Sequence, residues 1–419
     1  MASVVISIIS LLLGIGILLL GHGLIGTVLT LRAAAEQYSD MLIGLIMAAY
    51  FVGYIVGTFY CPRLINRVGH IRAFAVVAAV SAVIIIAHGF FVDPWVWLTG
   101  RLVFGACVVS VYMIVESWLN SRTDNALRGR VFAIYTIVTL SALAAGQFLL
   151  LAGDIRTLEL FALAGALFSL SLVPIALTKI AEPAPVPVVQ VDLKGLYALA
   201  PLALIASLLA GVVSSAFFSL GPLFAHDMGL AEGAVALFMA ATIAGGALFQ
   251  WPLGRWSDRI DRRRVLMLAG FGAAVAAAAM VPAGNTSPPA LMLLAVVYGG
   301  LAFAVYPLSV ALANDQVSSG GDAVGISGSL LLAYGLGATA GPLLAGGLME
   351  VAGPDGLVWF FAGCWLVLGA AALQALWRRT PAVAGEKEAF MPMTRTSPVA
   401  LEAQIEAQHE ATASETASS

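Results

Sequence analysis

The sequence predicts an all-α, multi-pass membrane protein whose twelve transmembrane helices form two six-helix bundles. Of its 419 residues, 61% are hydrophobic and 10% are charged, whereas an average soluble domain has roughly 25% charged residues. Apolar runs of about 20 residues, the length that crosses the hydrocarbon core of a bilayer, recur along most of the chain. The second half of the chain also repeats residues of the first half at constant spacing.

Twelve apolar runs, separated by short polar breaks, are predicted to be the transmembrane helices. The first run is too long for a signal-peptide core and no basic residue precedes it, so we expect it to be retained. The predicted limits are 4–27, 41–61, 73–92, 95–118, 131–152, 158–178, 197–223, 233–253, 265–283, 290–313, 326–349 and 355–377.

Two segments are too polar to be transmembrane. Residues 181–194 (AEPAPVPVVQVDLK) are rich in proline and are predicted to be a cytoplasmic linker between an N-terminal bundle (1–180) and a C-terminal bundle (195–378). Residues 379–419 are rich in Glu, Ala, Ser and Thr with few aromatic residues, so we expect a disordered cytoplasmic tail.

The distribution of Lys and Arg predicts the orientation. With the N-terminus inside, 17 of the 20 basic residues fall in cytoplasmic segments, whereas Arg32 and Arg156 fall outside and Arg101 lies within a helix. Basic loops stay on the cytoplasmic side of a membrane. We therefore expect both termini to be cytoplasmic, in agreement with an even number of spans.

The two halves of the sequence are related by an internal repeat. A shift of 192 residues places Gly53 on Gly245, and a shift of 194 places Tyr112 on Tyr306. Two copies of a six-helix unit in the same orientation form the parallel repeat of a transporter whose binding site lies between its halves.

The loop after the eighth predicted helix carries a motif. Its sequence GRWSDRIDRRR, residues 254–264, resembles the loop signature G-x-x-x-D-R-x-G-R-R of the major facilitator superfamily, with Asp261 in place of the second glycine. The first-half copy, residues 62–72, is degenerate, because Pro62 replaces the glycine and Asn66 replaces the acid.

Other segments carry the same resemblance, which covers about residues 1–378. LTGRLVFG, residues 98–105, is similar to the superfamily's fourth-helix R-x-x-x-G pattern, and VVSVYMIVESWLN, RGRVFAIY and QWPLGRWSD look most like its YcaD-like bacterial branch, which has no assigned function. The resemblance implies the major facilitator fold in a bacterial inner membrane. It also implies secondary transport by alternating access, with helices one, four, seven and ten around the site.

Composition and motifs exclude several other classes. A total of 20 Lys and Arg against 23 Asp and Glu gives a net charge of −3, without the positive surplus that a nucleic-acid binder needs. The three cysteines lack the spacing of a zinc site or a disulfide framework. Because no phosphate-binding loop, metal cluster or nucleophile constellation is present, we expect neither an enzyme nor a cofactor, and an ion gradient, most simply of protons, as the energy source.

Arg101 is the strongest candidate for a functional residue, because a cation within a membrane span is costly and normally faces a cavity or a partner. It either binds substrate or supports proton coupling in a cavity, or it extends to the outer interface. Tyr112 and Glu116 share its helix face. His22 in the first helix is either a proton relay or a histidine hydrogen-bonded to a neighbouring helix.

The second half offers fewer candidates. Tyr298 and Tyr306 of the tenth helix and Ser214 of the seventh present hydroxyls and aromatic faces to a substrate, with helix packing as the alternative. Neither charge of the fourth helix is repeated in the tenth, where Ala295 and Val310 stand. We therefore expect the two halves to contribute unequally to the site.

The loop signatures predict a cytoplasmic gate. Asp258, the intact acid of the two copies, is expected to close it through charge-assisted hydrogen bonds. We interpret Glu116 as a gate salt-bridge partner that replaces the acid missing at Asn66, with direct proton carriage and an exposed interfacial carboxylate as alternatives. The predicted gate residues are Glu116, Asn66, Arg67, Gly69, Arg72, Gly254, Asp258, Arg259 and Arg262.

Small residues at helical spacing predict close helix contacts. They are Gly53 and Gly57 in the second helix, and Gly337 and Gly341, followed by Pro342, in the eleventh. The superfamily resemblance implies that these two helices meet across the halves and slide during the transport cycle.

The leading hypothesis is therefore a monomeric secondary transporter in the lipid bilayer. Its expected cargo is a small organic solute, either neutral or amphiphilic or a monoanion paired with Arg101, with protons as the coupling ion and efflux favoured over uptake. The alternative is a lipid-moving protein or a non-transporting sensor on the same fold. Lipid movement predicts a lateral opening between helices, whereas a sensor favours a long soluble ligand-binding domain.

Overall fold

The computed structural model describes residues 2–123, 125–177, 191–316, 323–378 and 390. Within these ranges the chain is helical without a strand, and twelve helices are long and apolar enough to cross a membrane, which confirms the predicted fold class and number of spans. The elements are α1 (Ala2–Ala35), α2 (Asp40–Val68), α3 (His70–Phe90), α4 (Pro94–Arg122), α5 (Asn125–Phe148), η1 (Leu149–Ala152), α6 (Glu159–Leu170), α7 (Leu172–Ala176), α8 (Leu193–Leu199), α9 (Pro201–Asp227), α10 (Glu232–Arg259), α11 (Arg262–Thr286), α12 (Pro288–Asn314), α13 (Ala323–Ala352) and α14 (Asp355–Trp377).

Several helices extend beyond the predicted apolar runs. α1 continues to Ala35 rather than 27, where Arg32 forms a 2.7 Å ion pair with Glu36, and α2 continues to Val68 rather than 61. A hydropathy criterion stops near the first polar residues, but an existing helix continues because each added residue completes one more backbone hydrogen bond. α2 ends at Gly69, whose φ of 82° is a conformation that favours glycine.

The predicted sixth span is interrupted rather than continuous. α6 ends at Leu170 and α7 starts at Leu172, and the hydroxyl of the intervening Ser171 donates to the carbonyl of Phe168 at 2.6 Å. Pro174 has no N–H and cannot complete the helical bond to Leu170. Together α6 and α7 still form one span of membrane length.

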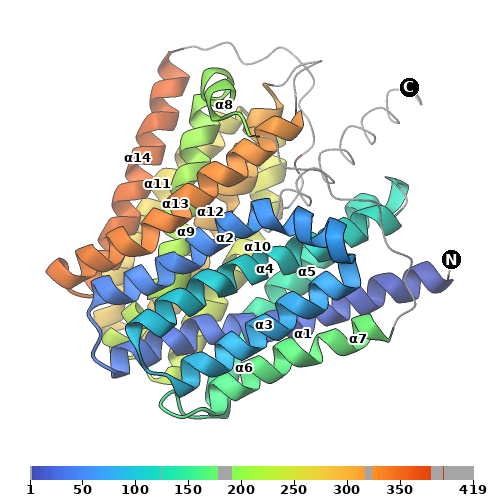
Figure 1. Cartoon of the computed structure of the whole chain (residues 1–419). Helices are drawn as coiled ribbons and strands as arrows, with labels where there is room; N and C mark the ends of the chain where they lie inside the picture. The colour runs from blue at the N-terminus through green and yellow to red at the C-terminus, as the bar shows by residue number, and fades with distance from the viewer. Residues whose placement is uncertain (1, 124, 178–190, 317–322, 379–389, 391–419) are drawn as a thin grey trace.

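The helices pack as two halves with the same internal pairing. In the first half α2 packs on α4, α1 on α5 and α3 on α6, and in the second half α10 packs on α12, α9 on α13 and α11 on α14. Each pair of the first half corresponds to one of the second half, in agreement with the sequence repeat. In Figure 1 the blue to green helices of the first half lie side by side, and the orange and red α13 and α14 lie with the other helices of the second half.

The segments predicted to connect and follow the bundles are described only in part. Of the linker 181–194, residues 191–194 are described, and α8 starts within it because the side chain of Asp192 accepts from the N–H of Gly195 at 2.9 Å. Of the tail 379–419, Phe390 is described. The remaining residues of both segments lie outside the described ranges.

The two ends of the bundle differ in charge. The basic end holds the turns at Gly69 and Ile260, next to most of the arginines, and the opposite end holds the turns at Gln37 and Gly229. Each successive transmembrane helix runs from one end to the other, so the described chain starts at the basic end and α14 returns to it.

Hydrogen bonds hold the two halves together at the end of the bundle opposite the basic end. The hydroxyl of Thr30 donates to the carbonyl of Ser219 at 2.7 Å, joining α1 to α9. The N–H of Met41 donates to the carboxylate of Glu350 at 3.0 Å, joining α2 to α13. α2 and α13 also pack extensively on each other, as expected from the superfamily resemblance.

The predicted glycine rows pack closely, but against helices of their own half. Gly53 contacts the carbonyl of Leu102, and Gly57 contacts Ala106, so the row of α2 packs on α4. In the same way, Gly337 and Gly341 of α13 lie on the backbone of α9. The contact across the halves uses different glycines: Gly44 meets the carbonyl of Pro342, and Gly346 meets the carbonyl of Asp40.

Gly105 is the position where this packing is most easily tested. A Cβ there would meet the carbonyl of Tyr50 and, at 3.0 Å, the N–H nitrogen of Tyr54, both in the backbone of α2. We expect Gly105→Ala to lower the free energy of unfolding by about 2 kcal/mol, because rigid backbone cannot yield to the added methyl group.

The matched control is Gly363→Ala in α14, where a Cβ meets open space. This variant should gain up to about 1 kcal/mol of helix propensity. Equal melting temperatures for the two variants would contradict the prediction.

Candidate functional site

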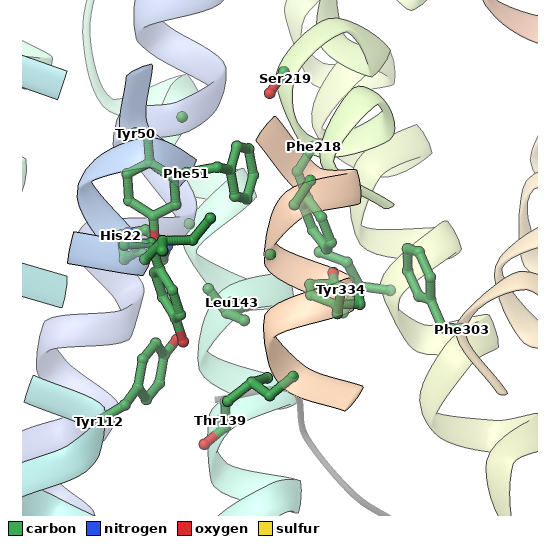
Figure 2. Close-up of a pocket in the computed structure, with 18 of the residues that line it drawn as sticks. His22, Tyr50, Phe51, Tyr112, Thr139, Leu143, Phe218, Ser219, Phe303 and Tyr334 are labelled. Carbon is green, nitrogen blue, oxygen red and sulfur yellow. The ribbon is translucent and has the colours of Figure 1, made fainter. Parts of the chain in front are cut away.

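A cavity of about 220 Å³ lies between the two halves. It is lined by α1, α2, α4 and α5 of the first half and by α9, α10, α12 and α13 of the second, and its lining reaches Val191 at the basic end. Among the described residues the contacts that join the halves lie at the opposite end, so the described cavity extends toward the basic end. Figure 2 shows the lining side chains of both halves facing each other across it.

Arg101 of α4 is buried and lines the cavity, with 6% of its surface exposed. Its guanidinium carbon lies 4.6 Å from the centre of the Tyr50 ring and 5.6 Å from that of Phe104, which is a cation–π arrangement. Within the described residues it forms no ion pair, and its buried Nε has no hydrogen-bond partner. This geometry fits the cavity-facing interpretation, because an arginine that extended to the interface would be exposed there.

His22 of α1 lies beside the same two rings. Its ring centre is 5.9 Å from that of Tyr50 and 5.8 Å from that of Phe104, so His22 and Arg101 share their aromatic neighbours. Within the described residues, the buried Nδ1 of His22 has no hydrogen-bond partner. The structure therefore brings the two predicted coupling residues together and leaves polar atoms of both available to a ligand.

The remaining lining is mostly aromatic and apolar. Figure 2 shows Tyr50, Phe51 and Tyr112 on one side of the cavity and Phe218, Tyr334 and Phe303 on the other. Of these, sequence reasoning singled out Tyr112. Tyr50 and Tyr54 were missed, although they lie one helical turn apart in α2, a spacing that places both on one face.

The polar groups at the depth of His22 hold α1 and α5 together. Gln147 donates from Nε2 to the carbonyl of Gly23 at 2.8 Å and accepts from the hydroxyl of Thr27 at 2.6 Å. The amide is thus satisfied between helices, as expected within a membrane. No lining residue of the described cavity is Asp, Glu or Lys, so Arg101 is its permanent charge.

Three predicted site residues lie elsewhere. Tyr298, Tyr306 and Ser214 are buried in the second half and do not belong to the described cavity lining. Tyr298 stacks on Phe361 at 5.4 Å and accepts a hydrogen bond from Trp365 at 3.4 Å. Helix packing, the alternative interpretation, therefore fits these residues better.

At the basic end, the second-half motif forms a charged cluster around Arg262. This arginine has 1% of its surface exposed and donates to Asp258 at 3.1 Å, to Asp315 at 2.7 Å and to the hydroxyl of Ser257 at 3.0 Å. Asp315, just after α12, was missed from the sequence because it lies 53 residues from Arg262 and carries no motif. Arg259, the neighbouring motif residue, is exposed.

The first-half copy of the motif is arranged differently. Asn66, Arg67 and Arg72 are exposed, and Gly69 forms the turn between α2 and α3. Glu116 is fully buried and accepts a hydrogen bond from Tyr135 at 2.7 Å. Its burial does not fit the interpretation as an exposed interfacial carboxylate, and the gate salt bridge of Glu116 stays a prediction.

A residue of the predicted tail contacts the second-half motif. The N–H of Phe390 donates to both carboxylate oxygens of Asp258, at 3.0 and 3.2 Å, and its ring lies directly on Gly254. Gly254 is buried, and a Cβ at that position would collide with the ring. The motif thus contacts α12 through Asp315 and the C-terminal region through Phe390.

Two halves of equal architecture around a cavity at their interface, built from twelve membrane-length helices, define a multi-pass transporter. The chain belongs to the major facilitator superfamily, since the sequence model of that family matches residues 11–331 and 204–408. As a member of a transporter family it is a secondary transporter rather than an enzyme.

Individual relatives agree with this family assignment. YcaD, an uncharacterized MFS-type transporter, is 27% identical over 342 residues in Salmonella newport (strain SL254) and in Escherichia coli O17:K52:H18, covering 81% of this chain and 88% of YcaD. The chain is thus similar to YcaD over most of its length.

Solved structures are similar in fold. The nucleoside transporter NupG has a TM-score of 0.74 at 15% identity, over 88% of this chain and 98% of NupG. A D-xylose-proton symporter has a TM-score of 0.70 at 16% identity, over 90% of this chain and 98% of the symporter.

Proposed function

We propose that this protein exports a small organic monoanion across a bacterial inner membrane by proton-coupled alternating access. Arg101 carries the proposal, because it is a buried cation in the cavity without an ion-pair partner among the described residues. A cation placed in this way is costly and normally serves a ligand. A single permanent positive charge matches a single negative charge on the solute. The cavity is enclosed by one chain, which supports a monomer as the working unit.

Proton coupling is proposed to run through His22. An arginine cannot release a proton near neutral pH, whereas a histidine can titrate in this range. His22 and Arg101 share the rings of Tyr50 and Phe104, so a proton on His22 and an anion at Arg101 would influence each other. His22→Gln keeps a polar side chain but cannot carry the proton, so it should uncouple transport from the pH gradient.

The orientation is proposed from the basic residues. Reporters fused after Arg72, Arg128, Lys194 and Arg264 are expected to report the cytoplasm, because basic loops are retained on that side. A fusion at Asp154 should report the outside. A stable Asp154 fusion with a cytoplasmic signal would overturn the orientation and, with it, the direction in which the cavity opens.

Transport itself is tested by comparing the solute content of cells that lack the gene with cells that overexpress it. Efflux predicts that an organic anion accumulates in the deletion strain and is depleted in the overexpressing strain. A protonophore should remove the difference, and overexpressed Arg101→Ala should behave like the deletion. The opposite sign would show uptake, and unchanged levels of every organic anion would contradict the proposed function.

Of the alternatives, lipid movement has an observation in its favour. A groove between α5 and α10 shares three lining residues with the cavity, and this is where the lateral opening that lipid movement predicts would lie. A sensor has no comparable support within the described residues, which form the transmembrane bundle and short connections.

A further inference from the structure

A second hollow, of about 510 Å³, lies between α5 and α10. The walls of this side groove are mainly small and apolar, with Ala133, Ala144, Ala244 and Ala247 among them, and none of the described wall residues is charged. α5 belongs to the first half and α10 to the second, so the groove lies on the seam between the two bundles. Motion of the halves would therefore change its width.

The side groove faces away from the bundle. Ile137, Leu248 and Trp251 line it and have 63%, 66% and 56% of their surface exposed. In a membrane-spanning bundle, exposed apolar side chains at mid-helix contact hydrocarbon. The groove therefore opens toward the acyl chains of the bilayer rather than toward water.

The side groove and the central cavity share a wall. Leu140 of α5 and Ile243 and Gln250 of α10 line both hollows. Toward the opposite end the same seam is closed, since α10 packs on η1 there and Leu151 lies 3.5 Å from the Cβ position of Gly233. A molecule in the cavity can thus extend into the groove only toward the basic end.

The distances fix the size of such a molecule. Gln147 of α5 donates a hydrogen bond to the carbonyl of Gly23, which is next to His22. Gln147 therefore lies at the same depth in the bundle as the charged site. Leu140 lies seven residues away along α5, about 10 Å, and Ala133 lies fourteen residues away, about 21 Å. A chain of this length would reach from Arg101 through the shared wall into the groove.

We infer that the substrate is a single-chain amphiphile with a monoanionic head, such as a medium-chain carboxylate, whose head binds at Arg101 while its chain lies in the side groove. This inference rests on the proposed function and specifies its substrate class. The unpartnered Nε of Arg101 and Nδ1 of His22 suit an acceptor head group, the aromatic cavity wall suits the first methylenes, and the seam gives the chain access from the bilayer.

The test uses the full-length protein in nanodiscs with a dodecanoate analogue that carries a photoactivatable diazirine at its chain end. Labelled residues are located by mass spectrometry. We expect labelling to concentrate in 133–144 and 243–251, and excess dodecanoate to suppress it. Dodecanol, dodecylamine and butyrate should each compete about tenfold less well or worse, because each lacks either the negative charge or the chain.

Three variants sharpen the result. Arg101→Gln should weaken the binding of dodecanoate, measured by its suppression of the labelling, about 100-fold. Ala247→Trp fills the groove from α10 and Ala144→Phe fills it from α5, so each should remove most of this labelling even if the other does not fold. Val275→Trp, at an exposed position of α11 outside both hollows, is the matched control and should label like the unmodified protein.

Two outcomes would overturn the inference. Labelling spread evenly over outward-facing helix positions and insensitive to Arg101→Gln would mean that the probe only occupies the bilayer. Equal competition by butyrate would mean that the chain is not recognised. In either case Arg101-dependent efflux of a short, water-soluble anion would leave the proposed function intact, whereas loss of all Arg101-dependent transport would remove the proposed function itself.

Discussion

Replacing Arg101 by glutamine is expected to lower substrate transport about 100-fold. Charge-assisted hydrogen bonds from a guanidinium to an anion contribute about 1.5–3 kcal/mol each, and a loss of about 2.7 kcal/mol corresponds to 100-fold weaker binding. Arg101→Lys retains the charge but loses the planar fork, so we expect about tenfold lower transport. The measurement is uptake of the identified solute into proteoliposomes over a range of concentrations.

The same variant separates a functional role from a structural one. Arg101 is buried without an ion-pair partner among the described residues, so its removal should leave the melting temperature unchanged or raise it. Arg32→Gln is the matched control, because Arg32 pairs with Glu36 and does not line the cavity. Transport at the unmodified rate by Arg101→Gln would contradict the assignment, and so would a fall in its melting temperature that accounts for the lost activity.

Replacing Arg262 by glutamine is expected to destabilise the protein by about 3 kcal/mol. Removing one partner of a buried ion pair costs about 3–5 kcal/mol, because the remaining charges lose their compensation. Here the carboxylates of Asp258 and Asp315 would face each other without the cation between them. We place the effect at the lower end because Asp258 remains partly exposed. The melting temperature in detergent measures it.

The cluster also tests the gate hypothesis. The control for Arg262→Gln is Arg264→Gln, since Arg264 is an exposed arginine in the same motif. Asp258→Asn keeps the size of the side chain but removes its negative charge. This variant should lower transport while its expression stays near normal. Asp315→Asn should act in the same direction, because Asp315 holds the shorter contact to Arg262, at 2.7 Å. Unmodified turnover in both aspartate variants would remove the gate hypothesis.

The membrane spans follow from local properties of the sequence. A bilayer core requires about 20 apolar residues in a helix that satisfies its own backbone hydrogen bonds, so composition and run length predict α2, α9 or α14 without knowledge of their neighbours. The interruption at Ser171 was not predicted, because one proline in an apolar run changes neither its length nor its hydropathy.

The composition of the site depends on which helices pack against each other. Arg101 was identifiable by itself, since any cation within a span demands an explanation. Its position beside His22 depends on the packing of α1, α2 and α4, and the lining of the cavity comes from eight helices. A tyrosine in an apolar helix has the same sequence signature whether it faces a cavity, as Tyr50 does, or the core, as Tyr298 does.

The sequence by itself thus determined the fold class, the number of spans and the repeat, and it singled out Arg101 as a candidate, because each depends on residues within one helix or on fixed spacing. Only the tertiary structure decided that Asp315 completes the Arg262 cluster, that the glycine rows pack on α4 and α9, and that a side groove shares a wall with the cavity. The physical reason is that side-chain contacts between distant helices depend on their rotation and crossing, which the apolar composition of a membrane helix does not encode.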